Sequence, residues 1–520
     1  MKAFRGAGLL PLLALSAQAD TVLRARDFYK TRNGFRMKHM EADDGLLEIV
    51  GNSTFEQLLD HSDPSRGTFP QRYWWDAEYF EEGGPIILYN PGEQNAEDML
   101  GYFANTTLPG YYAQQLKGAV IIIEHRYWGE SVPFDKLTTE TLQDLNLPNA
   151  IHDMTYFAKN VDCEFCEGGT CNSDENPWIL LGGSYSGALA AWTSEIDPGA
   201  NADPDPQGTF AAYHASSAVV EAIHDFWQYF TPIEAALPRN CSCDLKAVIQ
   251  YIDSVLAKGD EEEIIQLKTR FGLESLNNPD FADVLANPLS EFQSDQSITM
   301  AFCDYIEASN ANVESQSGDG VGLDTALEAY ASYIKESAGC GSGGSSCDTY
   351  SSLIPWDDPT VDWIRPWLWM VCNEPFGWHQ VGPDVSDGTN IVSAAMQETQ
   401  YSRRCPLMFP ETNGYVVGSA RGWTEDHLNQ WTGGWDAEFE KVIFVDGQYD
   451  PWRSASVSSD YRPEGGVYNT TEAPAFIVEG GVHCPEFEVD ENNPHILSVV
   501  QSSVEIMAGW IREWSPPKKV

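Results

Sequence analysis

Lysine and arginine are scarce in this chain, which has 30 of them against 78 aspartates and glutamates among its 520 residues. The formal net charge of −48 would repel a nucleic acid or an anionic membrane, so neither is an expected partner. Such a chain also repels itself at neutral pH and relaxes as its carboxylates protonate toward a pI of about 4.3. We therefore expect an acidic working environment, with the solubility of an exported protein as the alternative reason for the charge.

Long apolar runs are also missing, since no window reaches the roughly 18 apolar residues of a membrane-spanning helix. The short run Leu9–Leu15 follows two basic residues and precedes the small-residue site Ala17-Gln18-Ala19. This pattern predicts a secretory signal peptide over residues 1–19. We expect an exported protein, either extracellular or in the lumen of an acidic vacuolar compartment. Residues 20–45 are rich in basic residues and poor in core-forming ones, which fits a removable pro-segment or a disordered arm.

Four Asn-X-Ser/Thr sequons fit an export route through a glycosylating compartment. They predict glycosylation at Asn52, Asn105, Asn240 and Asn469.

Nearly continuous apolar runs indicate strands that are covered on both faces of a sheet. They lie at residues 85–90, 119–124, 178–183, 441–447 and 475–478, after a predicted strand pair at 55–61 and 68–75. Residues 149–161 place apolar side chains at helical spacing before the third run. Strands alternating with helices in this way predict an α/β fold with a doubly wound parallel sheet.

Residues 217–400 carry aromatic and helical segments but no long apolar strand. We expect an inserted, mostly helical cap domain there. Residues 46–216 and 401–520 would then form the first and second parts of the α/β domain.

The stretch Trp178–Trp192 changes from an apolar run to small residues around Ser184 and then to an Ala/Leu segment of helical character. A strand, a tight turn with an exposed serine and a helix form a nucleophile elbow. The small neighbours Gly182, Gly183 and Gly187 let the backbone double back, while Ser186 departs from the strict Gly-X-Ser-X-Gly pattern. A glycine-rich strand end without chemistry remains the alternative for this motif alone.

Two later strand ends carry the partners that such a serine needs. Asp450 follows the run at 441–447, and His483 follows the run at 475–478. The carboxyl ends of parallel strands share one edge of a sheet, and the order Ser, Asp, His is that of α/β-hydrolases. His483 would be the general base and Asp450 the acid that orients it. Asp446 is the alternative acid.

Other histidines, including His125 and His152, are interpreted as structural because they fall outside that edge or on a helix. Two backbone N–H groups would stabilise the oxyanion. We expect one from Tyr185 and the second from the loop at Gly92 and Glu93.

Several motifs together resemble the serine peptidase family of lysosomal Pro-X carboxypeptidase and dipeptidyl peptidase II, and most closely its fungal acid prolyl endopeptidases. The matching segments are 58–61, 68–75, 124–129, 182–192, 372–376, 447–452 and 480–484. The resemblance implies an α/β-hydrolase with a helical cap, hydrolysis on the carboxyl side of proline and an acidic pH optimum. No cofactor is expected. By motif it assigns Ser184, Asp450 and His483 as the catalytic triad.

The same resemblance places Trp452 beside a proline pocket, where an aromatic wall suits a rigid ring without an N–H. Phe376 and Trp378 are further candidates for this wall, with core packing as their alternative role. Glu93 or Glu374 would hold a substrate amine or support the site.

The expected substrates are proline-containing peptides or proteins. We expect an endopeptidase, with a proline-specific exopeptidase as the alternative, because the shape of the cap decides between them. A lipase or esterase would use the same triad, and a non-catalytic hydrolase-fold binding protein would be expected to have lost part of it. The sequence leaves the oligomeric state open.

Eleven cysteines are present. Cys163, Cys166 and Cys171 lie close enough to suggest a metal site, but no histidine accompanies them and an exported protein favours disulfides. No metal site is therefore predicted. The expected bridges are Cys241 or Cys243 with Cys303, Cys340 with Cys347, and Cys372 with Cys405. Because the total is odd, at least one thiol lacks an internal partner, and Cys484 is the candidate.

Overall fold

The computed structural model describes residues 51–166, 170–196, 208–308, 320–344, 347–348, 364–384, 388–397, 403–463 and 465–516. The predicted signal peptide and the basic segment that follows it, residues 1–45, lie outside these residues. The chain forms two compact units. The sheet unit comprises the described residues within Arg36–Ala236, Asp357–Gln380 and Tyr401–Val520, and the helical unit those within Leu237–Trp356 and Val381–Gln400.

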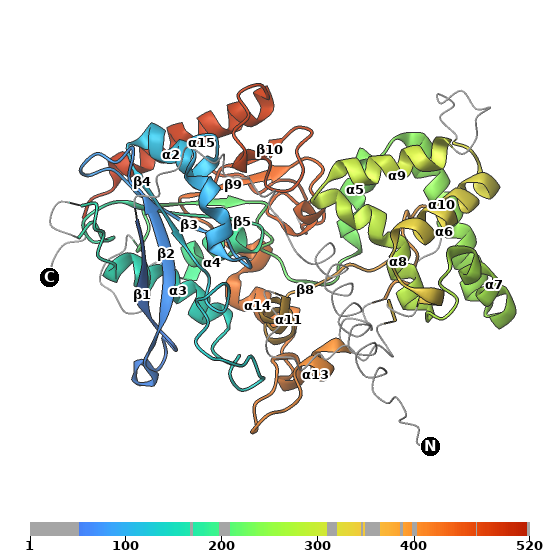
Figure 1. The fold of residues 1–520 in the computed structure, drawn as a ribbon. Helices are drawn as coiled ribbons and strands as arrows, with labels where there is room; N and C mark the ends of the chain where they lie inside the picture. Colours follow the sequence, from blue (N-terminus) through green and yellow to red (C-terminus); the bar gives the residue numbers. More distant parts are fainter. Residues whose placement is uncertain are drawn as a thin grey trace, which may run out of the picture. The chain divides into compact units, whose positions relative to one another are not determined.

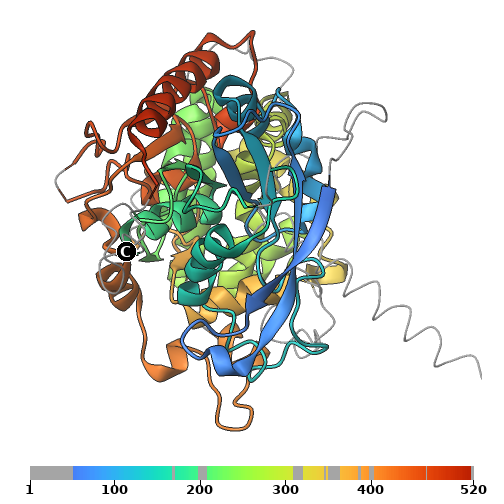
Figure 2. The same ribbon diagram turned by 90° about the vertical axis from the view of Figure 1, so that its left-hand side faces the viewer.

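The sheet unit is built on eight strands in the order β1-β2-β4-β3-β5-β6-β9-β10. Their bounds are β1 Gly51–Leu58, β2 Thr68–Asp76, β3 Ile86–Asn90, β4 Ala119–Ile123, β5 Trp178–Gly183, β6 Ala212–Ser216, β9 Val442–Gly447 and β10 Ala475–Val478. β1 and β2 form an antiparallel hairpin, the long blue ribbon of Figure 2, and β2 is antiparallel to β4. The remaining neighbours are parallel. Their carboxyl ends therefore meet at one edge.

Helices cover both faces of this sheet (Figure 1). α2 (Leu108–Leu116) and α15 (Pro494–Glu513) pack together on one face, and α3 (Leu147–Asn160) and α4 (Tyr185–Ile196) on the other. α3 begins where the Asn146 side chain accepts a hydrogen bond from the Asn149 N–H, beside a proline in the first turn. The strand order and the helices on both faces are those of an α/β-hydrolase.

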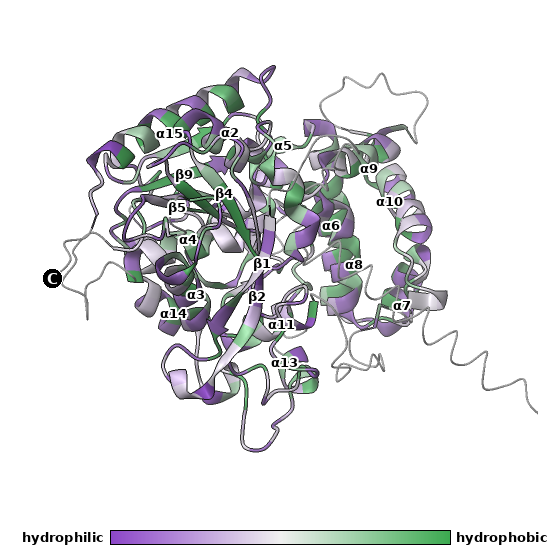
Figure 3. Cartoon of the chain, turned by 60° about the vertical axis from the view of Figure 1, so that its left-hand side comes forward, coloured by the Kyte–Doolittle hydropathy of each residue, from purple (hydrophilic) through white to green (hydrophobic). Residues whose placement is uncertain are grey.

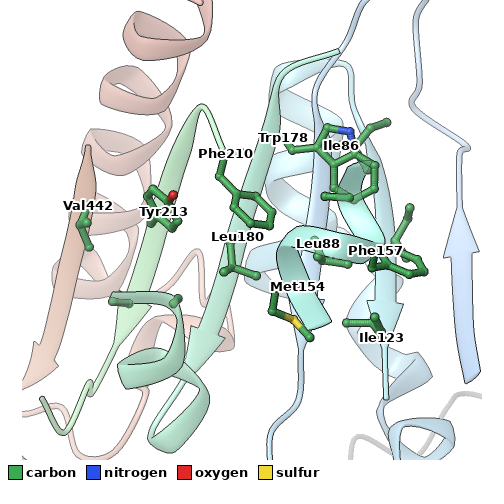
Figure 4. Packing of buried hydrophobic residues seen from close by; sticks show 14 of the residues in the cluster. Ile86, Leu88, Ile123, Met154, Phe157, Trp178, Leu180, Phe210, Tyr213 and Val442 are labelled. Atoms are coloured by element: carbon green, nitrogen blue, oxygen red, sulfur yellow. The ribbon is translucent and has the colours of Figure 1, made fainter. Parts of the chain in front are cut away.

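Apolar side chains from the strands and from α3 form the core of the sheet unit. In Figure 4, Met154 and Phe157 of α3 lie against Leu88, Leu180 and Ile123 of the sheet. All five are at most 1% exposed, and burying such a side chain stabilises the fold by roughly 1.5–3 kcal/mol. Figure 3 shows the central strands β4, β5 and β9 in hydrophobic green. These strands coincide with three of the apolar runs in the sequence.

The helical unit contains five long helices. They are α6 Arg239–Lys258, α7 Glu261–Phe271, α8 Asn278–Ser290, α9 Gln296–Ala308 and α10 Leu323–Ser337. Glycines in the left-handed conformation end α6 at Gly259 and α7 at Gly272, as is common at helix C-termini. A disulfide between Cys241 and Cys303 joins α6 to α9.

Part of the segment predicted as a cap packs with the sheet unit. Residues 217–236 and 364–380 belong to it, with α5 (Phe230–Ala236), α11 (Ile364–Asn373), and the short parallel strands β7 (Ile223–Asp225) and β8 (Gly377–His379). α13 (Arg404–Met408) and α14 (Glu425–Thr432) also lie in the sheet unit. The segments that carry Phe376, Trp378 and Glu374 therefore belong to the same unit as Ser184.

Disulfides form at Cys340–Cys347 and Cys372–Cys405, as expected, and Cys241 rather than Cys243 pairs with Cys303. The cluster near residue 166 contains a bridge between Cys166 and Cys171. Cys484 is a buried free cysteine, as predicted, and Cys163 is another.

Candidate active site

Ser184 stands between the end of β5 and the start of α4, with a φ of +61°. A non-glycine residue in this left-handed region is strained, and such strain is found where a nucleophile is presented from a sharp turn. The neighbouring glycines are required by space: a methyl group on Gly182 would lie 2.0 Å from the Ser186 carbonyl oxygen, and one on Gly187 would lie 2.4 Å from that of Ser216. This geometry is that of an elbow.

Ser186, which departs from the strict motif, holds the elbow closed with its hydroxyl. Its Oγ accepts a hydrogen bond from the Gly183 N–H at 3.0 Å and donates one to the Gly183 carbonyl oxygen at 2.8 Å. The side chain is 1% exposed, so both backbone groups of Gly183 are satisfied away from water. A serine therefore has a structural role at this position.

Asp450 and His483 form a buried pair at the ends of β9 and β10. His483 Nδ1 lies 2.9 Å from each carboxylate oxygen of Asp450, and both side chains have no exposed surface. Asp450 Oδ1 also accepts a hydrogen bond from the Trp452 N–H at 2.9 Å, at the start of the 3-10 helix η8 (Pro451–Ala455). The carboxylate is thus fixed from two sides.

Asp446, the alternative acid, has other partners. It accepts hydrogen bonds from Ser456 Oγ at 2.9 Å and Ser458 Oγ at 2.6 Å. Burial raises the pKa of Asp446 to about 7, against the effect of its hydrogen bond from Ser458. The contact with His483 belongs to Asp450.

The end of β6 brings the elbow and the segment of His483 together. The Ser184 N–H donates to the Ser216 carbonyl oxygen at 2.9 Å, and the Cys484 N–H donates to Ser217 Oγ at 2.8 Å. A methyl group on Gly183 would lie 2.9 Å from Cys484 Sγ. The residues next to Ser184 and His483 are therefore in close approach, on adjoining strand ends.

The loop after β3 lies against the elbow. Gly92 has a φ of +72°, and a methyl group there would lie 3.4 Å from Ser186 Cβ. Its N–H, however, donates to Asn90 Oδ1 at 2.7 Å, whereas the Glu93 carboxyl group interacts with its own backbone N–H. Tyr185 is the first residue of α4, where backbone N–H groups lack partners within the helix.

Three aromatic rings contact one another in sequence, beginning beside His483. The Trp452 ring lies 6.5 Å from the His483 ring and 5.9 Å from that of Trp378, between ring centroids. Trp378 stacks on Phe376 at 4.6 Å with an interplanar angle of 5°. All three predicted aromatic residues thus belong to one cluster. Phe226 and Tyr229 also pack on Trp452 and were not predicted as members of this cluster.

Glu93 and Glu374 are each 4% exposed, and burial raises the pKa of each to about 7. Glu93 follows Gly92 in the loop that lies against the elbow, and an electrostatic interaction with His483 opposes part of this rise in the pKa of Glu93. Glu374 Oε1 accepts a hydrogen bond from Asn373 Nδ2 at 3.0 Å. It lines a cavity of about 740 Å³ whose lining residues do not include Ser184, Asp450 or His483. Glu93 is therefore the carboxyl group beside the candidate catalytic pair.

His125, interpreted as structural, contacts the residue after Ser184. Its Nε2 lies 3.0 Å from the Tyr185 hydroxyl, and its Nδ1 lies 2.8 Å from the Arg126 carbonyl oxygen. Burial lowers the pKa of His125 to about 4, so its imidazole is neutral above that pH. His125 therefore positions the Tyr185 ring. His152 is exposed on α3.

The sequence matches the model of one known family. The model of the family described as serine carboxypeptidase S28 matches residues 57–504. The chain belongs to this family. It is thus a serine peptidase that acts on peptide substrates.

Relatives of this S28 peptidase match different shares of its length. Serine protease vicPb of Bipolaris victoriae (strain FI3) is 35% identical over 492 residues, which is 90% of each chain. A probable extracellular serine carboxypeptidase of Arthroderma benhamiae is 27% identical over 86% of this chain and 64% of that protein. Lysosomal Pro-X carboxypeptidase of Mus musculus is 34% identical over 139 residues, 26% of this chain and 28% of that protein.

Among solved structures, an arylesterase matches the S28 peptidase with a TM-score of 0.34 and 11% identity, over 95% of this chain and 98% of that one.

Within the described part of the chain, no helix has the length and apolar character needed to cross a membrane. The sequon residues Asn52, Asn105 and Asn469 are exposed, and Asn240 is half-buried.

Ser217, Phe226 and Tyr229 are residues around this site that were not predicted from the sequence. No signal indicated Ser217, because it directly follows β6 (Ala212–Ser216), a strand that was not predicted from the sequence. His125 was expected to lie outside this edge, whereas it comes two residues after β4, whose carboxyl end lies at the same edge as that of β3.

Proposed function

We propose that this S28 peptidase hydrolyses peptide bonds on the carboxyl side of proline through an acyl-enzyme formed on Ser184. Ser184 Oγ attacks the scissile carbonyl carbon while His483 Nε2 takes its proton. The protonated imidazole then gives that proton to the leaving amine, and the acyl group remains on the serine. Water, activated by the same imidazole, releases the acyl group and restores Ser184.

The observation that carries this proposal is the contact of His483 Nδ1 with both oxygens of Asp450 at 2.9 Å. An Nδ1–H donated to a carboxylate fixes the tautomer in which Nε2 holds the lone pair that a base requires. The adjoining strand ends support the same proposal, since Ser216 and Ser217 bond to the backbone of Ser184 and Cys484.

For the oxyanion we propose the Tyr185 N–H as the first donor, at the N-terminus of α4, where the helix dipole favours negative charge. The expected second donor lay at Gly92, within the loop after β3. Because the Gly92 N–H already donates to Asn90, we assign the second position to the Glu93 N–H. Its release from the Glu93 carboxyl group would accompany substrate binding.

The aromatic cluster formed by Trp452, Trp378 and Phe376 supports specificity for proline. Proline offers a flat-sided apolar ring and lacks an N–H, so shape and apolar contact must recognise it. Trp452 is our primary candidate for this contact because its ring is beside that of His483.

Working conditions and location follow from charge and from the N-terminal sequence. A net charge of −48 and the buried carboxyl groups of Glu93 and Glu374 favour an acidic medium, in which these groups are neutral. The signal-like segment at residues 1–19 and the sequons support export to an extracellular or vacuolar location.

The test is digestion of a proline-containing peptide at about pH 4, with the products read by mass spectrometry. One form of the peptide is blocked at both ends, and the others have a free amino or a free carboxyl terminus. Cleavage after the internal proline supports the endopeptidase that we propose. Cleavage restricted to peptides with a free amino terminus supports a dipeptidyl peptidase in which Glu93 holds the substrate ammonium group. Cleavage restricted to a free carboxyl terminus supports a carboxypeptidase. Hydrolysis of fatty esters without cleavage of any prolyl peptide contradicts the proposal.

A further inference from the structure

Away from the candidate catalytic pair, two histidines and a glutamate from three separate segments of the sheet unit bring their side chains together. The ligand atoms of His224 on β7, His379 at the end of β8 and Glu425 at the start of α14 all lie within 4.8 Å of one another. His224 Nδ1 is 2.7 Å from Glu425 Oε1, and the two imidazole rings lie edge to face with centroids 5.1 Å apart. His379 is buried and His224 is exposed, so the cluster opens to solvent on one side.

The backbone that carries these three side chains is held by several hydrogen bonds. β7 pairs with β8 in parallel, and the Phe226 N–H donates to the His379 carbonyl oxygen at 2.8 Å. Asn429 ties α14 to the segment before β7, because its Oδ1 accepts from the Ala222 N–H at 2.8 Å and its Nδ2 donates to the Ala222 carbonyl oxygen at 2.9 Å. The three candidate ligands therefore lie on a fixed framework.

We propose that His224, His379 and Glu425 bind a divalent first-row transition metal ion of the Zn²⁺ type. Two imidazoles and one carboxylate are a ligand set that Zn²⁺ uses, with bonds of about 2.0–2.2 Å and water in the fourth position. Neighbouring ligand atoms of a tetrahedral site with such bonds lie about 3.3 Å apart. The three ligand atoms here lie within 4.8 Å of one another, so binding an ion would draw them closer together. Mg²⁺ and Ca²⁺ prefer oxygen ligands and are poor candidates.

Both a positive and a negative side chain lie near the proposed metal site. The Arg404 guanidinium acts on His379 and opposes a bound cation. The Glu425 carboxylate, bonded to His224 and close to His379, offsets it. The ligands come from segments far apart in the chain, which is why no spacing motif in the sequence indicated a metal site.

A bound ion would connect β7, β8 and α14. β8 carries Trp378 directly before His379, so the ion would restrict the strand that presents this aromatic ring. Metal binding itself is independent of the peptidase mechanism. An effect on substrate selection through Trp378 rests on the function proposed above.

The experiment is zinc titration of the purified, chelator-treated full-length protein by calorimetry at about pH 7.5, where imidazoles are neutral enough to bind a metal. We expect a saturable site that takes Zn²⁺ but not Mg²⁺. His224→Asn and Glu425→Gln should each weaken this site at least tenfold. His495→Asn is the matched control, because His495 is exposed and faces a single carboxylate, Glu479, at 3.5 Å. It should leave the affinity unchanged.

Thermal unfolding with and without Zn²⁺ gives a second readout that also reports whether each variant folds. Saturating Zn²⁺ should raise the midpoint of the parent protein and of His495→Asn by about 2 °C or more, and should not raise that of folded His224→Asn or Glu425→Gln. Equal zinc affinity in all four proteins, or no saturable zinc binding by the parent, overturns the proposal. If zinc does not bind but the protein cleaves after proline, the proposed function is retained and the metal site is rejected. If zinc binds but the protein does not cleave after proline, the metal site is retained and the proposed function is rejected.

Discussion

His483 presents one nitrogen, Nδ1, to both carboxylate oxygens of Asp450, at 2.9 Å from each. The neighbouring Asp446, four residues earlier, is bonded to Ser456 and Ser458 instead. These two carboxyl groups on one strand end allow the role of the acid to be tested with a matched control.

Asp450→Asn should lower kcat by about 10⁴-fold, because an amide at this position favours the wrong tautomer of the imidazole. Asp446→Asn should lower kcat by less than about tenfold, because the pKa of Asp446 is raised by burial to about 7 and the group is already neutral in acid. The measurement is kcat on a prolyl peptide at about pH 5, with circular dichroism to establish that both variants fold. A larger loss in Asp446→Asn than in Asp450→Asn would reverse the assignment.

Glu93 should limit activity as the medium becomes neutral. Burial raises the pKa of Glu93 to about 7, so this carboxyl group is neutral in acid and gains its negative charge as the pH rises through that value. A negative charge beside the proposed oxyanion site opposes the charge that develops in the transition state. We expect kcat/KM of the parent protein to fall through about pH 7 and that of Glu93→Gln to fall less.

Glu374→Gln is the control for this profile, because Glu374 has the same raised pKa but bonds to Asn373 and faces a separate cavity. It should keep the pH dependence of the parent protein. A Glu93→Gln variant with an unchanged profile that loses activity only on peptides with a free amino terminus would instead assign Glu93 to substrate binding.

The free energy of unfolding should be greatest in mild acid. Folding raises the pKa values of Glu93 and Glu374 from 4.5 to about 7, so the folded state holds protons that the unfolded state has lost between these values. The contribution of these two groups to the free energy of unfolding is fully present below about pH 4.5. It is lost as the pH rises from there through about 7, and the loss is on the order of 3 kcal/mol for each group.

Protonation of Asp153 lowers the free energy of unfolding at the acidic end of the pH range. Its burial opposes ionisation, but the charge and hydrogen bonds of Arg126 outweigh burial and hold the pKa of Asp153 below its usual value. This contribution is lost as the pH falls toward that lowered pKa. Urea unfolding from about pH 3 to 8 checks both effects, and a maximum above pH 7 would contradict this account.

Ser186→Ala should destabilise the protein because it leaves the buried N–H and carbonyl groups of Gly183 without the hydroxyl that bonds to both. Such a loss costs about 1–3 kcal/mol. Ser186→Gly removes the same hydroxyl but leaves space for a water molecule, so it should cost less than the alanine variant. Thermal unfolding of the three proteins measures the order. Equal midpoints for all three would show that the hydroxyl does not hold the elbow.

Much of the sheet unit could be predicted because its parallel strands are buried on both faces. β3, β4, β5 and β9 are continuous apolar runs, and each lies within a residue or two of its predicted position. The elbow was predicted for a different reason, because small residues surround Ser184 between an apolar run and a helical segment. The structure agrees, since a side chain would not fit at Gly182 or Gly187.

β6 was not predicted because polar and aromatic residues interrupt it. His214 lies in the middle of this central strand, where its ring nitrogens are 2.8 Å from the Tyr112 hydroxyl and 3.0 Å from Glu486 Oε1. These partners are far away in the sequence, so a local pattern could not indicate that a histidine would be satisfied there. The strands β7 and β8 were missed because three residues carry too little pattern.

Labelling with a fluorophosphonate, followed by mapping of the modified residue by mass spectrometry, tests directly whether Ser184 is the nucleophile. We predict one modified residue, Ser184, loss of prolyl peptidase activity in proportion to labelling, and no labelling or turnover in Ser184→Ala. Full turnover by folded Ser184→Ala, or a label on another residue in the active parent protein, would contradict the account.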